Sequence, residues 1–254
     1  MISWLVPAHL RAGIGRPESI FDLRCMDRSM RKLTVLLMLL MLSDLSMAQS
    51  TPQDLVEDAK ALFDANDYNQ ALNLTETALR MDSSLEQAWL LRGKILYAMG
   101  MLRDAYQSFD RATQLDPSDA EAWNYKGIVL AAMQRYNNSL QCFESAIQAD
   151  PMNYEAWSNK GNTLVSLGRL DDAISAFDRS IILNQTYVGA WIGKGLAFYY
   201  QKRYHEALAM YERALQLDPN NSIALYNKGL ALQKLGMNKE AEEAFRAAEQ
   251  NQKR

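Results

Sequence analysis

Residues 89–117 read WLLRGKILYAMGMLRDAYQSFDRATQLDP, and the main features of this stretch return every 34 residues along the chain. Trp, Gly, an aromatic residue and Pro each keep this interval, with few exceptions. The series are Trp89, Trp123, Trp157 and Trp191; Gly93, Gly127, Gly161, Gly195 and Gly229; Phe109, Phe143, Phe177, Tyr211 and Phe245; and Pro117, Pro151 and Pro219. Unrelated residue types that share one period indicate an internal structural repeat.

Each repeat follows the pattern W-x-x-x-G-x-x-L, then A-x-x-x-F-x-x-A, then D-P. The second repeat carries it at Trp89, Gly93, Leu96, Ala105, Phe109, Ala112 and Pro117. This pattern resembles the tetratricopeptide repeat (TPR) family in both spacing and residue type. The resemblance implies an all-α fold, a right-handed α-solenoid of six helix-turn-helix units within residues 49–254. With Trp at repeat position 4, the units are 52–85, 86–119, 120–153, 154–187, 188–221 and 222–254.

The physical chemistry of the repeat supports two helices per unit. Apolar residues spaced by three and four mark two amphipathic helices, and we expect Trp to fill the core between them. Gly93 and its equivalents let the two helices approach closely, because a side chain there would hold them apart. The first unit departs from the pattern, since Leu55 replaces Trp and Thr75 replaces the aromatic residue.

Residues at the expected helix ends agree with this arrangement. Thr51 followed by Pro52 predicts a helix start, and the segment from Ser118 to Glu121 predicts a capping box. The first helix of a unit is expected to stop at Gly100, Gly168 and Gly236, and the second at the Asp-Pro pairs that begin with Asp116, Asp150 and Asp218. At two positions where earlier units have apolar residues that face the next unit, the sixth unit has Glu242 and Glu249. We therefore expect it to be the terminal unit of the array.

The first 48 residues differ from the repeats. Residues 26–48 contain a basic stretch, the apolar run Leu33 to Leu42, and small residues Ser46 and Ala48 before Gln49, which is the pattern of a secretory signal peptide. We therefore expect an exported protein, secreted or in the cell envelope; the alternative is a chain anchored in the membrane by an uncleaved signal. Residues 1–25 fit no element, and our hypothesis is that they are mis-assigned sequence upstream of a start at Met26 or Met30.

Composition excludes several functions. The 254 residues carry 27 Lys and Arg against 30 Asp and Glu, a net charge of −3, so there is no basic excess for binding nucleic acid. Two His and two Cys offer no usual metal-ligand spacing, and the Gly-rich nucleotide-binding loops are missing. Cys142 is expected to be a buried thiol, and His205 lacks a catalytic partner. We expect no enzyme activity and no cofactor.

Two further patterns have structural interpretations. A basic residue recurs at repeat position 7 and an acidic residue at position 25, and we expect these side chains to pair rather than to form a basic stripe for an anionic polymer. The basic series is Arg92, Lys126, Lys160, Lys194 and Lys228; the acidic series is Asp110, Glu144, Asp178 and Glu212. N-x-[ST] sequons at Asn73, Asn137, Asn184 and Asn220 are candidate glycosylation sites in an exported chain, and Asn220 is also a candidate N-cap.

A stack of helix pairs forms a curved ribbon whose first helices line the concave side. The resemblance implies a non-enzymatic protein-protein interaction scaffold that binds an extended peptide segment of a partner in this groove. The alternative is a self-assembling structural protein of the cell envelope. The groove residues expected from the family are Asn124, Tyr125, Ser158, Asn159, Asn162, Gly193, Tyr199, Tyr200, Tyr226 and Asn227, with Gly193 leaving a dip beneath the two tyrosines. The Lys and Arg residues of the family's carboxylate clamp are missing, so a C-terminal carboxylate is not the expected ligand.

Overall fold

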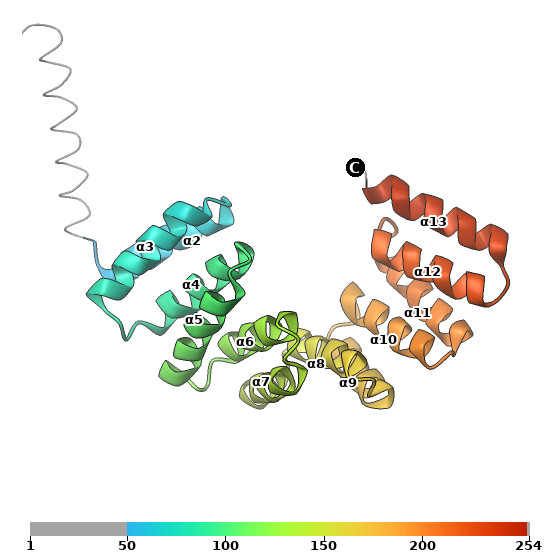
Figure 1. Ribbon diagram of the computed structural model, residues 1–254, viewed down its shortest axis with the longest axis horizontal. Coiled ribbons are helices and arrows are strands. Elements are labelled where there is room, and N and C mark those ends of the chain that lie inside the picture. Colours follow the sequence, from blue (N-terminus) through green and yellow to red (C-terminus); the bar gives the residue numbers. More distant parts are fainter. Residues whose placement is uncertain (1–49, 253–254) are drawn as a thin grey trace, which may run out of the picture. The chain divides into compact units, whose positions relative to one another are not determined.

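A computed structural model describes residues 50–252, and the expectations for residues 1–25 and 26–48 lie outside this range. All regular elements in the described range are α-helices, which form six consecutive antiparallel pairs (Figure 1). The pairs are α2 (Pro52–Asp64) with α3 (Tyr68–Met81), α4 (Glu86–Ala98) with α5 (Leu102–Leu115), α6 (Ala120–Ala132) with α7 (Tyr136–Ala149), α8 (Tyr154–Ser166) with α9 (Leu170–Leu183), α10 (Val188–Tyr200) with α11 (Tyr204–Leu217), and α12 (Ser222–Lys234) with α13 (Asn238–Gln252). The predicted α-solenoid of six helix-turn-helix units is confirmed.

Successive pairs pack in one direction along the chain. The second helix of each unit contacts the first helix of the next unit, and consecutive first helices also touch each other. Within residues 50–252 no such contact joins consecutive second helices. The first helices are therefore closer together than the second helices, so they line the inner side of the array formed by α2 to α13 (Figure 1).

The repeated glycine and aromatic residue form the centre of the second to sixth units. Phe109, Phe143, Phe177 and Tyr211 are fully buried. A Cβ atom built on Gly93 would lie 2.5 Å from the ring of Phe109, and the third to sixth units repeat this contact. The predicted close approach of the helices at glycine is confirmed, because the ring occupies the space that a side chain would need.

The tryptophans differ from the expectation of a core position, since all four are only half-buried. Each indole N–H donates a hydrogen bond to the backbone carbonyl six residues earlier, in the loop that precedes the helix. For Trp123 this bond to Pro117 is 2.9 Å long. A buried indole N–H needs an acceptor, and the loop carbonyl provides one only if the ring stays at the edge of the core.

The helix caps confirm some predictions and correct two. Thr51 and Asp54 form a capping box, with Pro52 at the first helical position. Ser118 is not the cap of α6: Asp119 accepts from the Glu121 N–H at 2.8 Å instead. The N-cap of α12 is Asn221, not Asn220. In both cases the start of the helix is set by the repeat, which places the cap one residue later.

The helix ends at the Asp-Pro pairs are as predicted. Asp116, Asp150 and Asp218 are the C-caps of α5, α7 and α11, and all three have extended backbone conformations. Pro disfavours helical geometry in the residue before it and so favours the helix end there. Asp82 and Asn184, which precede no Pro, end α3 and α9 in the same extended conformation, so the repeat also sets this helix end.

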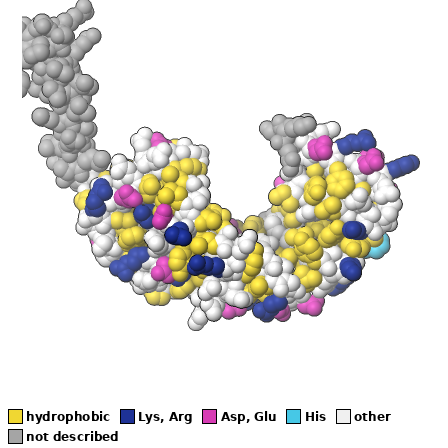
Figure 2. All heavy atoms as spheres, viewed as in Figure 1, with side chains coloured by type: hydrophobic (Ala, Val, Ile, Leu, Met, Phe, Trp, Pro, Cys, Tyr) yellow, Lys and Arg dark blue, Asp and Glu magenta, His cyan; other side chains and the backbone are white. Residues whose placement is uncertain are grey.

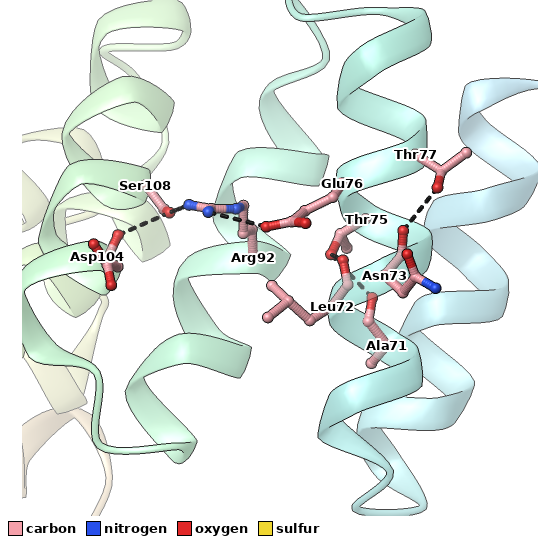
Figure 3. Close-up of polar contacts among 9 residues, drawn as sticks. All are labelled: Ala71, Leu72, Asn73, Thr75, Glu76, Thr77, Arg92, Asp104 and Ser108. Atoms are coloured by element: carbon pink, nitrogen blue, oxygen red, sulfur yellow. Dashed lines mark hydrogen bonds and ion pairs between the residues drawn. The ribbon is translucent and has the colours of Figure 1, made fainter.

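A series of ion pairs joins consecutive units. Each base at repeat position 7 pairs with the acid at position 25 of the preceding unit, at N–O distances from 2.6 to 3.2 Å. Figure 3 shows the first pair, in which Arg92 of α4 lies between Glu76 of α3 and Ser108 of α5. The bases are largely buried and already paired, so the predicted structural role of this series is confirmed.

Candidate functional site

The inner side of the array is the groove formed by the first helices α2, α4, α6, α8, α10 and α12. The groove contains three hollows, each between consecutive first helices. Concave surfaces with a few polar groups are the usual places where proteins bind ligands. Starting from the N-terminal side, we name the three hollows the charged hollow, the amide hollow and the tyrosine hollow.

The tyrosine hollow, between α8 and α10, has a volume of about 570 Å³. Its lining residues are Asn162, Val165, Ser166, Gly168, Leu170, Leu196 and Tyr200. Tyr200 is 55% exposed, and its ring lies edge-on to Tyr199 with 6.1 Å between the ring centres. This hollow carries no charged side chain, so it offers apolar contact area and hydroxyl and amide groups for hydrogen bonding.

The amide hollow, between α6 and α8, is smaller, with a volume of about 240 Å³. Asn159, Asn162 and Ser166 line it together with Ile128 and Ala131. Asn162 also lines the tyrosine hollow, and its side chain is exposed. The two hollows therefore adjoin, and a bound segment that crosses α8 meets Asn162.

Two of the expected groove residues are buried and cannot contact a ligand. Asn124 is 4% exposed and Ser158 is 1% exposed. The Asn159 side-chain amide donates to the side-chain oxygen of Asn124 at 3.1 Å, which links α6 to α8. Both buried residues stand at repeat position 5, which the first helix of the next unit covers. The expectation that these two side chains face a partner is wrong.

The same rule explains the exposure of Tyr226. It also stands at repeat position 5, but no helix of the described residues follows α13, and Tyr226 is 52% exposed. Ile223, one turn earlier on α12, is 62% exposed. Asn227, Tyr125 and Tyr199 are half-buried. Large exposed apolar side chains on a groove are candidate contact residues for a partner.

Gly193 does not leave a dip beneath the tyrosines. A Cβ atom built there would lie 2.4 Å from the ring of Phe177 and 3.1 Å from the side-chain oxygen of Asn162. The space is filled by a core ring of the preceding unit, so the glycine relieves crowding between α9 and α10. The expected dip is wrong, and Gly193 is a packing residue.

The charged hollow lies over α2, α4 and α6 and has a volume of about 510 Å³, and none of the predicted groove residues lines it. Its apolar lining residues are Val56, Phe63, Leu90 and Leu91. Its charged lining residues are Glu57, Lys60, Asp64, Glu86, Lys94, Asp119 and Glu121. Figure 2 shows charged side chains among apolar ones over the N-terminal part of the face in view, whereas over the C-terminal part they lie mainly toward the outer rim. The pattern of a single repeat carries no signal for this hollow, because three units contribute to its lining.

Glu86 is the unusual residue of the charged hollow. Its Oε1 atom is buried and is, among the described residues, the one buried side-chain oxygen or nitrogen without a hydrogen-bond partner. Burial is the largest cause that raises the pKa of Glu86 to about 7. Repulsion from Asp119 and a hydrogen bond with the Asp119 side chain come next, and repulsion from Asp116 and Glu121 adds to the effect. Lys60 and Lys94 line the same hollow, but no salt bridge within the described residues joins a base to Glu86, so its carboxyl stands in a mainly negative environment.

Other residues considered in the sequence take structural positions. Cys142 is buried, and burial raises the pKa of its thiol to about 11, so it is unreactive near neutral pH. His205 is exposed at the start of α11. The described residues contain no group of three or more His, Cys, Asp or Glu side chains placed to hold a metal ion. In the same range, no helix combines the length and the hydrophobicity that a bilayer crossing requires.

The four sequons differ in their accessibility. Asn73 lies within α3, and the buried hydroxyl of its sequon partner Thr75 donates to backbone carbonyls (Figure 3). Asn137 lies within α7, and the buried hydroxyl of its partner Ser139 donates to the Gly127 carbonyl. The side-chain oxygen of Asn184 accepts from its own Thr186. Asn220 is exposed in the turn before α12. Glycosylation of these residues stays a prediction.

Family models now identify the repeat. Models described as tetratricopeptide repeat or TPR repeat match residues 62–127, 126–187, 195–236 and 223–252. The chain belongs to the tetratricopeptide repeat family. TPR arrays present extended concave surfaces on which they bind protein partners, so this chain is a protein-interaction scaffold. A search among curated proteins found no match.

Several solved TPR structures are similar in fold. PilW, described as a widely conserved type IV pilus biogenesis factor, has a TM-score of 0.71 and 24% identity, and the match covers 76% of this chain and 90% of PilW. The structure of pilF from Pseudomonas aeruginosa has a TM-score of 0.67 and 18% identity, and the match covers 76% of this chain and 88% of pilF. YrrB, described as a TPR protein with an unusual peptide-binding site, has a TM-score of 0.57 and 24% identity, and the match covers 69% of this chain and 90% of YrrB. At these identities the similarity shows the shared fold.

Proposed function

We propose that this TPR protein binds an extended, mainly uncharged segment of a partner protein across the amide and tyrosine hollows. The observation that carries the proposal is the accessible, uncharged surface of Asn162, Leu196 and Tyr200 in the groove of α8 and α10. Tyr and Asn provide contact area, donors and acceptors at modest entropic cost. YrrB, which shares the fold and is described as having a peptide-binding site, supports this assignment.

The test uses a library of random ten-residue peptides displayed on phage and selected on the immobilised full chain. We expect the enriched peptides to bind with a Kd that rises at least tenfold, about 1.4 kcal/mol, in the double variant Asn162→Ala, Tyr200→Ala. Asn159 is left unchanged because its loss would leave the buried oxygen of Asn124 without a donor. Both replaced side chains are exposed, so the melting temperature should stay within about 2 °C.

The matched control is Gln141→Ala with Ile182→Ala, two exposed residues of the second helices α7 and α9. This variant should bind the enriched peptides as the unmodified protein does. If no peptide is enriched, or if both double variants bind alike, the groove is not a peptide-binding site.

Self-assembly at the cell envelope is the alternative function, and the exposed end of the described array does not favour it. Glu242 and Glu249 of α13 stand at the positions that pack against a following unit in the rest of the array, and both are exposed. Stacking a second copy on this face would bury two carboxylates without partners. Molecular size should therefore be the same at low and high protein concentration.

A further inference from the structure

The charged hollow has a carboxylate that the fold does not require. Repeat position 1 carries Pro52, Glu86, Ala120, Tyr154, Val188 and Ser222 in the six units, so only the second unit places an acid there. The other units form the same pair of helices without it. A packing role common to all repeats is thereby excluded for Glu86.

The neighbouring acids have roles that Glu86 lacks. Asp119 caps α6 by accepting from the Glu121 N–H. Glu121 accepts from the Lys94 ammonium at 2.5 Å. Each of these carboxylates is engaged within the protein, whereas the buried Oε1 of Glu86 has no hydrogen-bond partner. A buried oxygen without a partner is costly and needs an explanation.

The charges of the hollow do not balance. Glu57, Asp64, Glu86, Asp119 and Glu121 line it, against Lys60 and Lys94. Lys94 is already paired with Glu121 and lies 5.1 Å from the centre of the Tyr125 ring. The hollow therefore keeps a negative charge, which attracts a cationic group and disfavours an anionic one.

The apolar lining of the hollow indicates which kind of cationic group fits it. Val56, Leu90 and Leu91 lie beside the carboxylates. Lys and Arg side chains have an apolar stem that packs on such surfaces and a charged head that seeks acceptors. A volume of about 510 Å³ is within the usual range of ligand sites. A free metal ion would use only the acidic part of this surface.

We infer that the charged hollow receives a Lys or Arg side chain of the bound partner segment, whose ammonium or guanidinium group pairs with Glu86. This inference rests on the proposed function and extends it. The segment is uncharged where it crosses α8 and α10, and it carries a basic residue where it reaches α2, α4 and α6. The cation balances the excess of negative charge that the lining carboxylates leave around Glu86.

The test examines the same enriched ten-residue peptides on the full chain. We expect most of them to contain Lys or Arg beside apolar residues. Replacing that residue of the peptide by Gln should raise the Kd at least tenfold with the unmodified protein and less than threefold with the Glu86→Gln protein. The control is Glu240→Gln, an exposed acid of α13, which should keep the full tenfold effect.

A second measurement separates ion pairing from a structural effect of the variant. A cation binds the ionised carboxylate, so the affinity of the unmodified protein for the basic peptide should increase from pH 5.5 to pH 8. The Glu86→Gln protein should show a flat profile over the same range. Enriched peptides without a basic residue, or equal losses in both proteins, overturn this inference alone. Failure to enrich any peptide overturns the proposed function.

Discussion

At the scale of single residues, Glu86 shows how one carboxyl group links stability to pH. Its ordinary pKa of 4.5 is raised to about 7 in the folded protein, first by burial and then by Asp119. The folded state thus holds this proton more tightly than the unfolded state does. Below about pH 4.5 both states are protonated and the group has no effect on stability. As the pH rises from about 4.5 to 7, ionisation destabilises the folded state progressively.

Glu86→Gln should therefore raise the melting temperature at pH 8, where the wild-type carboxylate is ionised, and should leave it almost unchanged at pH 4.5. Thermal unfolding followed by circular dichroism at the two pH values measures the difference. Glu155→Gln is the matched control, because Glu155 is an exposed acid in the first turn of α8. A difference in melting temperature between Glu86→Gln and wild type that is the same at both pH values would contradict the electrostatic explanation.

At the scale of elements, every first helix ends in the same way. The residue at repeat position 15 has a positive φ angle, between 60° and 79°, in all six units. The N–H of position 16 bonds to the carbonyl of position 11, for example Arg135 to Leu130 at 2.8 Å, which is a Schellman motif. Gly100, Gly168 and Gly236 suit this backbone, but Asn66, Gln134 and Lys202 adopt it too. The turn is therefore imposed by the packing of the helix pair and not by glycine alone.

Gln134→Gly and Lys202→Gly should each stabilise the protein by roughly 0.5–1 kcal/mol. Relief of the left-handed strain, roughly 1–2 kcal/mol, exceeds the entropy that glycine loses on folding, roughly 0.5–1 kcal/mol. Urea unfolding measures the change. Gly100→Ala provides the reverse test: nothing lies within 4 Å of its Cβ position, so any loss of stability comes from the backbone angle. If Gly at position 134 or 202 destabilises, the side chains there make contacts that outweigh the strain.

At the scale of the whole molecule, the array is held together by contacts between neighbours. Within the described range each unit packs only on the units before and after it, so the stability is a chain of nearest-neighbour interactions. Trp157 belongs to one such junction. Its ring packs against a cluster that contains Leu140 of the third unit and Phe177 of its own unit.

Trp157→Ala should weaken this junction by roughly 2–3 kcal/mol, below the ~3–5 kcal/mol of a fully buried aromatic residue, because the indole is half-buried. A weak junction in the middle of the array lets its two sides unfold separately, so the thermal transition should broaden as well as shift. Differential scanning calorimetry records both. Met152→Ala, a change at a 68% exposed side chain nearby, should do neither. An unchanged transition in Trp157→Ala would show that the indole does not join the units.

The repeat, the six helix pairs and the contacts that recur along the array could be predicted from the sequence. Gly93 against Phe109 and Lys126 against Asp110 follow from the period, because identical neighbours at a fixed interval place the same side chains together. The side of each first helix that faces the groove could also be predicted approximately, because the helical period decides which positions lie on the same side.

Which of those positions a partner can reach depends on how neighbouring units pack in space. Asn124 and Ser158 are covered by the first helix of the next unit, whereas Tyr226 stays exposed. The Phe177 ring fills the space beside Gly193. The charged hollow also depends on three helices from three units. Exposure, hollows and the pKa of Glu86 arise from side chains of different units meeting in space, and a pattern that describes one unit at a time does not contain that information.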